Sequence, residues 1–538
     1  MGLLAGDEHA SPGQTGHGSS VDEDSLSLSD DSGFESTVGG DAEMKAPLTR
    51  EDKKAMALLI VLYIIQGVPI GLAMETLPFL LRERLSYSKI AIFSLSSYPY
   101  SLKLLWSPIV DARFFPSVGR RRSWIIPMQT LLGSLMLWMS FSVQAWVDDA
   151  AHRIYALTVI FTILVVIAAT QDIAVDGWSL TLLSRENLSY ASTCQTVGIT
   201  IGWLMSFTVF LALNSEAFSK KWGTPILTLG AYLRFCSIAS FGATLWLIFF
   251  QKERSEVLSK DETSITSVYK SIWRVSRLKS VQSFLVLHLV SKVGFAADDA
   301  ATSLKMVEKG LGKEDFAMAV LLDFPIQIVF GYFIARWSRG DRPLRPWIWA
   351  FWPRLLFAFL AAVVLWKFPA PPITASFFAF LIVFRSLGEM PRSVRCWDDV
   401  RSNFCRSTTQ FVCSGSFHAR VSDPGIGGTY ITLLNTVSNL GSTWPRFFVL
   451  RGIDYFTIAT CVANSDSTSL AANGAECVSE EGKALCSAAA GKCVMERDGY
   501  YITTGICLVV GLLFIVGHIV PTAKRLQALP LTMWRVAR

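Results

Sequence analysis

From Ala55 onward the chain consists of long apolar runs separated by short charged breaks. A helix needs about 20 residues to cross the hydrocarbon core of a bilayer. Open strands cannot cross it, because their backbone groups would find no partners in lipid. The runs therefore predict an all-α membrane protein. The candidate spans lie at 56–80, 89–110, 123–146, 154–176, 190–213, 225–250, 281–301, 315–337, 347–368, 372–388, 425–450 and 500–520.

A break between the sixth and seventh runs divides these twelve spans into two sets of six. We expect two six-helix halves of the kind found in major facilitator transporters, at 55–250 and 281–520. A basic cytosolic linker at 251–280 joins them, and a cytosolic tail at 521–538 follows the last span. A second long break, 451–498, lies inside the C-terminal half.

The composition agrees with a membrane location. Hydrophobic residues make up 51% of the chain and charged residues 17%, whereas soluble domains carry about 25% charge. This balance excludes a disordered chain, a disulfide-rich miniprotein and an ordinary soluble enzyme. The segment 1–54 is different, because it is acidic and rich in Ser and Gly. It cannot bury enough apolar surface to offset its ordering entropy, so we expect a disordered cytosolic tail.

The distribution of Lys and Arg predicts the orientation, because these residues accumulate in cytosolic loops. With the N-terminus in the cytosol, the breaks on that side hold roughly twice as many Lys and Arg as those on the other side. Both termini are therefore expected to be cytosolic. The break 451–498 then lies outside the cytosol, where thiols tend to pair. Its cysteines predict two disulfides, with three pairings open: Cys461, Cys477, Cys486 and Cys493.

Ionisable residues occur inside the predicted spans. Each costs at least about 2.5–3.5 kcal/mol at the bilayer centre and is a functional candidate by default. The cations are Lys103, Arg234, Lys292 and Arg354. We expect them to surround a wet cavity that binds an anion such as a phosphate, which suits both Arg and Lys. The alternative is a set of salt bridges that tie helices together.

Acidic residues suggest coupling and gating. Asp172 and Asp176 are four residues apart and share a helix face, and two close carboxylates tend to share a proton. A proton route is one interpretation, and a structural tie between helices is the other. Asp111 ends the second span, and the basic turn that contains Arg121 follows it. The two predict a latch on the cytosolic side, although any cytosolic loop can be basic.

No soluble catalytic motif is present in the sequence. The chain has neither a Walker A loop nor an HExxH motif, and we predict no catalytic residue, cofactor, metal site or nucleic-acid partner. A membrane acyltransferase would need an intramembrane His beside an acid. His288 lies within a span, but it is too far from Asp298 along one helix to pair with it. We interpret His288 as structural.

Several strings are more specific than the hydropathy pattern. They are QGVPIGLA (66–73), SLKLLWSPIVDA (101–112), GRRRSW (119–124), AATQDIAVDGWSLTLLSREN (168–187) and VSDPGIGGTYITLLNTVSNLGSTWP (421–445). With these strings the chain resembles the acetyl-coenzyme A transporter family of the endoplasmic reticulum membrane, a relative of the major facilitator superfamily. The likeness runs from about residue 55 to 520.

The resemblance implies a multi-pass transporter of the endoplasmic reticulum membrane that moves acetyl-CoA from cytosol to lumen by alternating access. Proton coupling and exchange both remain open, and a homodimer is one alternative for its assembly. Taking the residues and the resemblance together, the candidate solute contacts are Lys103, Lys292, Arg354, Arg234, Asn435 and Asn439. The candidate gating or proton-coupling residues are Asp172, Asp176, Asp299, Asp111 and Arg121. Arg234 does not obviously match the family pattern.

Two other functions are alternatives to acetyl-CoA transport. A proton-driven permease for another large anion, such as a bacterial muropeptide permease, has the same type of fold. A membrane acyltransferase that consumes acetyl-CoA in place belongs to a different class, and the missing pair of His and acid argues against it.

One stretch departs from the family pattern. The segment EMPRSVRCWDDVRSNFCR (389–406) is highly charged, where the family has a continuous apolar helix. Deleting it would rejoin the apolar residues on either side. We hypothesise an unspliced intron or another gene-model error. If mature messenger RNA contains these codons, the segment is a real insertion that breaks the tenth span.

Overall fold

The computed structural model describes residues 49–184, 187, 190–223, 225–253, 265–312, 315–322, 325, 344–369, 376–377, 380–381, 407–422, 427–462 and 475–535. Most of the predicted tail therefore lies outside the described residues. So do most of the predicted eighth and tenth spans and the anomalous segment 389–406.

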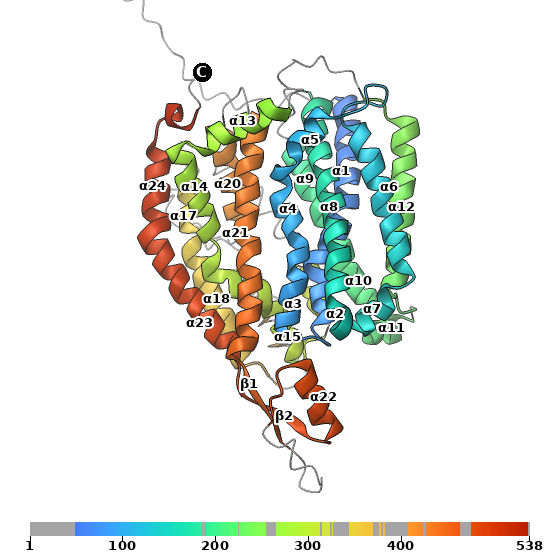
Figure 1. Ribbon diagram of the computed structural model, residues 1–538, viewed down its shortest axis with the longest axis vertical. Helices are drawn as coiled ribbons and strands as arrows, with labels where there is room; N and C mark the ends of the chain where they lie inside the picture. Colours follow the sequence, from blue (N-terminus) through green and yellow to red (C-terminus); the bar gives the residue numbers. More distant parts are fainter. Residues whose placement is uncertain are drawn as a thin grey trace, which may run out of the picture. The chain divides into compact units, whose positions relative to one another are not determined.

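The N-terminal half is built from helices that follow the first six predicted spans (Figure 1). They are α1 (Arg50–Gly71), the π-helix η1 (Leu72–Thr76), α2 (Leu77–Leu81), α3 (Tyr87–Ser94), α4 (Tyr98–Leu102), η3 (Lys103–Leu105), α5 (Ser107–Ala112), α6 (Arg122–Ser140), α7 (Val143–Asp148), α8 (Ala150–Leu182), α9 (Tyr190–Leu204), α10 (Phe210–Asn214), α11 (Glu216–Trp222) and α12 (Leu229–Phe250). Proline occupies an early position in α4 and in α5, and the second span is accordingly divided into short helices.

Helix α1 begins at Arg50, inside the segment that the sequence predicts to be a disordered tail. The side chain of Thr49 accepts a hydrogen bond from the backbone of Asp52, which caps the helix. The acidic first turn also favours the positive end of the helix dipole. Further along, α1 packs closely on α9, and a Cβ added to Gly202 would lie 2.7 Å from the Cα of Gly67. Small residues permit this approach.

The linker and the C-terminal half follow in the order α13 (Ile265–Ser276), α14 (Lys279–Val290), η6 (Val293–Phe295), η7 (Asp298–Thr302), α15 (Ser303–Glu308), α17 (Leu344–Trp349), α18 (Phe351–Trp366), α20 (Ser407–Val421), α21 (Gly427–Phe456), α23 (Gly499–Phe514), η9 (Ile515–Ile519) and α24 (Val520–Ala528). Among the described residues, six helices are long and apolar enough to cross a membrane. A seventh qualifies if the pair Lys279–Phe295 and Asp298–Glu308, bent by 49°, is one span.

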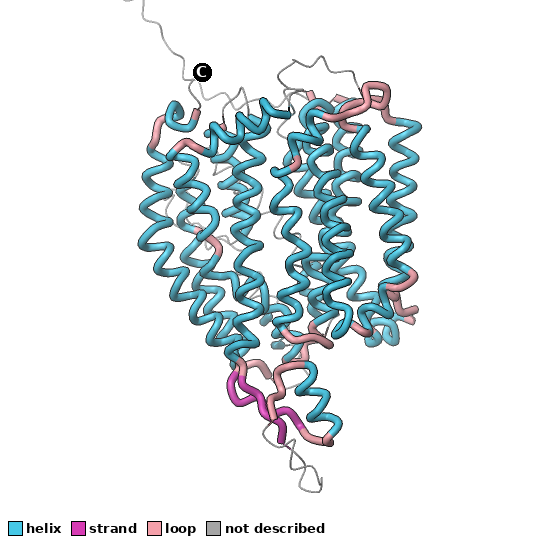
Figure 2. Tube along the Cα trace, viewed as in Figure 1, coloured by secondary structure: helices cyan, strands magenta, loops and turns pink. Residues whose placement is uncertain are grey.

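The helices stand side by side in two groups, with α3 and α4 packed against α21 where the groups meet (Figure 1). Helix α13 lies across one end of the bundle, which we call the linker end. The opposite end, which we call the loop end, carries β1 (Ile458–Val462), α22 (Glu480–Ala488) and β2 (Lys492–Arg497). The two strands pair antiparallel (Figure 2). The prediction of an all-helical chain therefore misses a small sheet outside the bundle.

Helix α20 lies outside the predicted tenth span, 372–388. It packs against α17, at the start of the ninth span. Phe377, which precedes the anomalous segment, lies near the end of the ninth span. Its ring is 5.3 Å from that of Phe368. The two pieces thus flank opposite ends of one neighbouring span. The prediction that 389–406 interrupts the tenth span concerns residues outside the described part of the chain.

Candidate functional site

The N-terminal half contains a buried ion cluster. Lys103 lies on η3, where the second span narrows to a 3-10 turn, and Asp172 and Asp176 lie one helical turn apart on α8. The Lys103 ammonium bonds to the Asp172 carboxylate and lies 3.1 Å from Oδ2 of Asp176. The Asp172 side chain is fully buried, whereas that of Asp176 is 34% exposed. The two acids predicted to share a helix face, Asp172 and Asp176, therefore both contact the predicted cation Lys103.

Two polar residues that sequence reasoning missed complete this cluster. The hydroxyl of Tyr63 donates to Oδ1 of Asp176 at 2.9 Å, and Nε2 of Gln195 donates to the same oxygen at 2.7 Å. They come from α1 and α9, the helices that pack closely through their glycines. The position of Gln195 in an apolar run was the available signal, because a buried amide needs a partner.

The C-terminal half contains a second ion cluster. Nη2 of the Arg354 guanidinium, on α18, donates to both carboxylate oxygens of Asp299 of η7, at 2.7 and 3.0 Å. The guanidinium also donates to Oε1 of Gln410 at 2.6 Å and lies 3.8 Å above the ring of Phe295. The Asp299 side chain remains 45% exposed. A guanidinium forms charge-assisted hydrogen bonds with phosphates as well as with carboxylates.

Lys292 differs from the other two cations. Its ammonium donates to the backbone oxygen of Ser438 at 3.2 Å and to the hydroxyl of Ser442 at 3.0 Å. Within the described part of the chain it forms no ion pair. Lys292 is partly buried, and a cation with only neutral partners keeps its charge available for an anion. Lys103 and Arg354 are instead neutralised by carboxylates in this conformation, so for them the alternative of helix-tying salt bridges describes the observed contacts.

A histidine pair extends the polar region of the C-terminal half. Nε2 of His288 lies 3.0 Å from Nε2 of His418, and Nδ1 of His418 lies 2.7 Å from Oδ1 of Asn435. His288 is therefore not a lone histidine, and its interpretation as structural stays a prediction. His418 escaped notice because it follows the anomalous segment, where no span was predicted. Asn439, the other member of the predicted pair, contributes its backbone oxygen to Ser442 and Thr443.

Arg234 does not join these clusters. It is exposed on α12, next to Phe235 and four residues before Ile238, both of which are exposed on the outside of the bundle. It lies near the start of the helix, where a long cationic side chain can reach the interface. Sequence reasoning could not tell which face of this helix turns inward. We leave Arg234 out of the site.

Asp111 and Arg121, which the sequence predicts to form a latch, are in contact. Nη1 of Arg121 lies 2.5 Å from Oδ1 of Asp111. The backbone amides of Arg121 and Arg122 also donate to the carboxylate of Glu253, at the end of the sixth span. The basic turn thereby connects the second, third and sixth spans within the N-terminal half.

Polar contacts join the two halves toward the loop end. Arg82 contacts Glu308 at 2.7 Å, and the backbone amide of Ser88 donates to Asp454 at 2.6 Å. Nearer the middle of the bundle, the hydroxyls of Ser101 and Thr443 are 2.8 Å apart. A cavity of about 440 Å³ lies at the loop end, lined by Arg82, Tyr87, Lys305, Glu308, Asp454 and Lys483 among others. Its lining does not include the Lys103 or Arg354 clusters.

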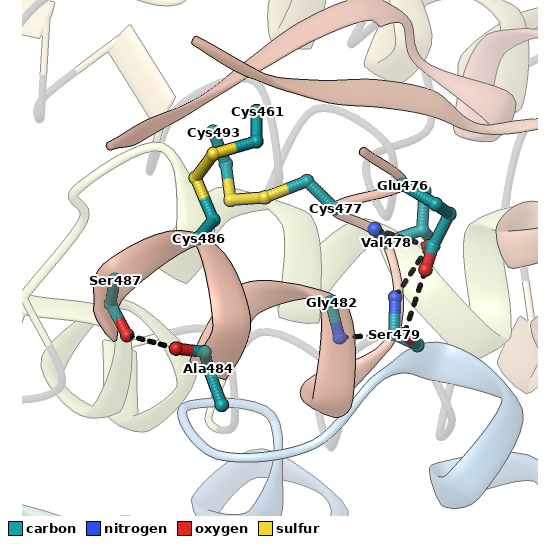
Figure 3. The surroundings of a disulfide bond; sticks show 10 residues. All are labelled: Cys461, Glu476, Cys477, Val478, Ser479, Gly482, Ala484, Cys486, Ser487 and Cys493. Carbon is teal, nitrogen blue, oxygen red and sulfur yellow. Dashed lines mark hydrogen bonds between the residues drawn. A yellow bond between two sulfur atoms is a disulfide. The ribbon is translucent and has the colours of Figure 1, made fainter. Parts of the chain in front are cut away.

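The loop-end domain is held by the four predicted cysteines. Cys461 pairs with Cys486, and Cys477 pairs with Cys493 (Figure 3). This choice among three pairings could not be made from the sequence. Three of these sulfurs lie within 4.8 Å of one another. Because all are in disulfides, they offer no thiolate to a metal.

Carboxylates of this domain are stabilised in their ionised form. Burial opposes ionisation of Glu480, but hydrogen bonds from the Ser86 backbone and its own amide, and the nearby Lys89, lower its pKa overall. Burial likewise opposes ionisation of Glu476, and the amides of Ser479 and Val478 lower its pKa (Figure 3). Glu480 therefore meets the first turn of α3, in the other half, as an anion.

The chain matches the family described as acetyl-coenzyme A transporter 1 over residues 55–263, 254–345 and 340–536. It belongs to the acetyl-coenzyme A transporter family. An uncharacterised membrane protein of Saccharomyces cerevisiae is 37% identical over 569 aligned positions, which cover 91% of this chain and 98% of that protein. The anhydromuropeptide permease of Escherichia coli K12 is 28% identical over 151 residues, 28% of this chain and 30% of that protein.

Solved structures place this acetyl-coenzyme A transporter family member in the major facilitator fold. A structure of proton-dependent oligopeptide transporters is 11% identical, with a TM-score of 0.52, and the match covers 88% of this chain and 99% of that chain. The prediction of a helical major facilitator-like membrane protein is confirmed. Because the family and the matching structures are transporters, the chain is a membrane transporter and not an acyltransferase.

Proposed function

We propose that this protein carries acetyl-CoA from the cytosol into the lumen of the endoplasmic reticulum by alternating access. The observation on which this proposal rests is Lys292, a partly buried cation inside a predicted span that forms no ion pair with the described residues. Membership of the acetyl-coenzyme A transporter family supports the choice of solute. A solute with a pyrophosphate and a further phosphate brings the negative charge that such a position lacks.

Arg354 would join this contact when the solute binds. Its Nη2 atom is engaged by Asp299, and that carboxylate is only half-buried. A phosphate oxygen can replace the carboxylate on this nitrogen, because a guanidinium binds both kinds of anion. The displaced Asp299 carboxylate would then be hydrated. The Arg354–Asp299 pair is thus the proposed arrangement of the site without bound solute.

The loop end is proposed to be the lumenal gate, closed in this structure. Contacts such as Arg82–Glu308 and Lys89–Glu480 join the halves there. Disulfides in the same region suit an oxidising lumen, and the excess of Lys and Arg on the other side suits the cytosol. In this assignment both termini are cytosolic and the structure corresponds to a state closed to the lumen.

The Lys103 cluster is proposed to couple transport to a second ion. It has one cation and two carboxylates, so it can accept a proton on Asp176 without losing its remaining ion pair. A proton-coupled carrier would use this change to alter the contacts of Tyr63 and Gln195. Exchange without protons is the alternative, in which the cluster would only tie α8 to its neighbours.

Uptake into liposomes tests the proposed solute. Purified protein in liposomes should accumulate intact acetyl-CoA labelled in both the acetyl group and the CoA moiety, at a fixed ratio of the two labels. Unlabelled CoA and ATP serve as competitors that separate recognition of the acyl group from recognition of the nucleotide. Absence of uptake in either membrane orientation, with protein that remains folded, would reject acetyl-CoA as the solute.

A second candidate is a proton-driven permease for another large anion. The match to the anhydromuropeptide permease favours it, although that match covers little more than a quarter of the chain. The same liposomes, loaded with labelled anhydromuropeptide in place of acetyl-CoA, distinguish the two. Uptake of the muropeptide and not of acetyl-CoA would support this alternative.

A further inference from the structure

Helix α20 presents a polar stripe to the inside of the C-terminal half. Gln410, Ser414 and His418 are four residues apart, so they lie on one helix face. All three are buried. Gln410 accepts from Arg354, and the Ser414 hydroxyl lies 3.2 Å from Nε2 of His418. The stripe thus runs from the Arg354 cluster to the histidine pair.

The hydrogens in the histidine pair follow from its partners. The oxygen of Asn435 can only accept, so Nδ1 of His418 carries a hydrogen and donates it. In neutral His418 the other nitrogen, Nε2, is then an acceptor. It lies 3.0 Å from Nε2 of His288 and 3.2 Å from the Ser414 hydroxyl. Two acceptor nitrogens would repel each other at 3.0 Å, so we assign the hydrogen between the rings to Nε2 of His288. His288 thus donates a hydrogen bond to His418, and His418 donates one to Asn435. We call these two hydrogen bonds the hydrogen-bond chain.

This chain determines the orientation of the Asn435 amide. With Oδ1 engaged by His418, the Nδ2 group is directed away from the buried pair. Asn435 is exposed, whereas both histidines are buried. The neighbouring turn of α21 carries Ser438, whose backbone oxygen holds the ammonium of Lys292. Asn435 and the backbone oxygen that accepts from Lys292 therefore lie about one turn apart on α21, while Lys292 itself lies between α14 and η6.

We propose that His418, held by His288, is a positioning residue that turns the Asn435 amide into a hydrogen-bond donor for an acceptor oxygen of the transported anion. This inference rests on the proposed function for the identity of the solute. Asn435 and Lys292 together would contact one oxygen-rich group, with a neutral donor beside a cation. The histidines act through Asn435 and do not touch the solute.

Histidine tautomers test the hydrogen-bond chain without any solute. Protein labelled with ¹⁵N-histidine is placed in lipid nanodiscs, and its signals are assigned by difference from single variants at 288 and 418. The expected spectrum shows hydrogen on Nδ1 of His418 and on Nε2 of His288. The opposite tautomer at either position, or a charged ring at neutral pH, would overturn the proposal.

Isosteric substitutions test the positioning role. An Asn side chain places its amide near the position of Nδ1 in His, and a Gln side chain reaches the position of Nε2. His418→Asn and His288→Gln each preserve the link toward Asn435, so the KM for acetyl-CoA should stay within about twofold of the wild-type value. His418→Gln and His288→Asn break a link, and KM should rise roughly 3- to 10-fold, as for one neutral hydrogen bond. In all four, kcat should change little.

The crossed pattern separates positioning from simple packing. A structural role would make both substitutions at one position equally harmful, with lower thermal stability in each, and that result would overturn the proposal. Equal KM values in all four variants would do so too. Asn435→Asp keeps the acceptor but removes the outward donor, and should raise KM without loss of folding. If wild-type protein takes up no acetyl-CoA, the proposed function fails, while the tautomer spectra still decide the hydrogen-bond chain.

Discussion

The ion clusters of the two halves have opposite compositions. In the N-terminal half one cation, Lys103, meets two carboxylates. In the C-terminal half two cations, Lys292 and Arg354, accompany one carboxylate, Asp299. With all groups ionised, the first cluster has a formal charge of −1 and the second of +1. Two halves with the same type of helical bundle thus offer different chemistry.

The difference suggests a division of labour. A cluster with surplus carboxylate can take up a proton, whereas one with surplus cation attracts an anion. The burial of the clusters differs as well. Asp172 is fully enclosed, and Asp299 is nearly half-exposed. Water can therefore replace a lost partner more easily in the C-terminal cluster than in the N-terminal one.

The largest expected effect is on stability, from Lys103→Met. Removing this cation leaves two carboxylates at a buried site, and breaking a buried pair costs about 3–5 kcal/mol. Arg354→Met should cost less, about 1–3 kcal/mol, because Asp299 can be hydrated. Thermal unfolding of the purified protein measures both. The double variant Lys103→Met with Asp172→Asn should recover part of the loss, and equal costs for the two single variants would remove the contrast in burial.

The next effect concerns affinity, from Lys292→Gln. Loss of one charge-assisted contact should weaken acetyl-CoA binding by about 1.5–3 kcal/mol, with thermal stability nearly unchanged. Concentration dependence of uptake measures the change. Arg234→Gln removes a cation from the outer face of α12 and serves as the matched control, with no change expected. Unaltered uptake by the Lys292 variant would exclude it as a solute contact.

A third effect concerns coupling, from Asp176→Asn. If the N-terminal cluster carries a proton, wild-type uptake should respond to an imposed pH gradient and the variant should not. Asp299→Asn, in the other cluster, should keep the response. Initial rates in liposomes with and without the gradient provide the measurement. A wild-type rate that is independent of the gradient would favour exchange.

The smallest effect is expected at the loop end, which contacts both halves. The pKa of Glu480 is lower in the folded protein than its ordinary value of 4.5. Its contribution is therefore complete above about pH 4.5 and is lost as the pH falls through the lowered folded-state value. Glu480→Gln should remove about 0.5–1.5 kcal/mol at neutral pH. Hydrogen exchange of the α3 amides reports the change, with Glu481→Gln as the control that should leave protection intact.

Much of the fold could be predicted, whereas the site could be predicted only in part. Asp172 and Asp176 share a helix face by spacing alone, and their nearness to Lys103 could not be read from spacing. Arg234 was included because it lies in an apolar run, and it faces outward. His418 was missed because the anomalous segment 389–406 hides its helix. The first two cases concern the neighbour or the face of a residue, and that of His418 concerns its location in a helix.

The sequence by itself determined that the chain crosses a membrane many times as helices, because lipid offers no partner to an open backbone and the apolar runs have the required length. It also determined which residues carry charge into the bilayer. Only the tertiary structure decided which charges neutralise one another, which cysteines pair and which cation stays without an acid. Those outcomes depend on contacts between helices far apart in the chain, and no local pattern encodes such contacts.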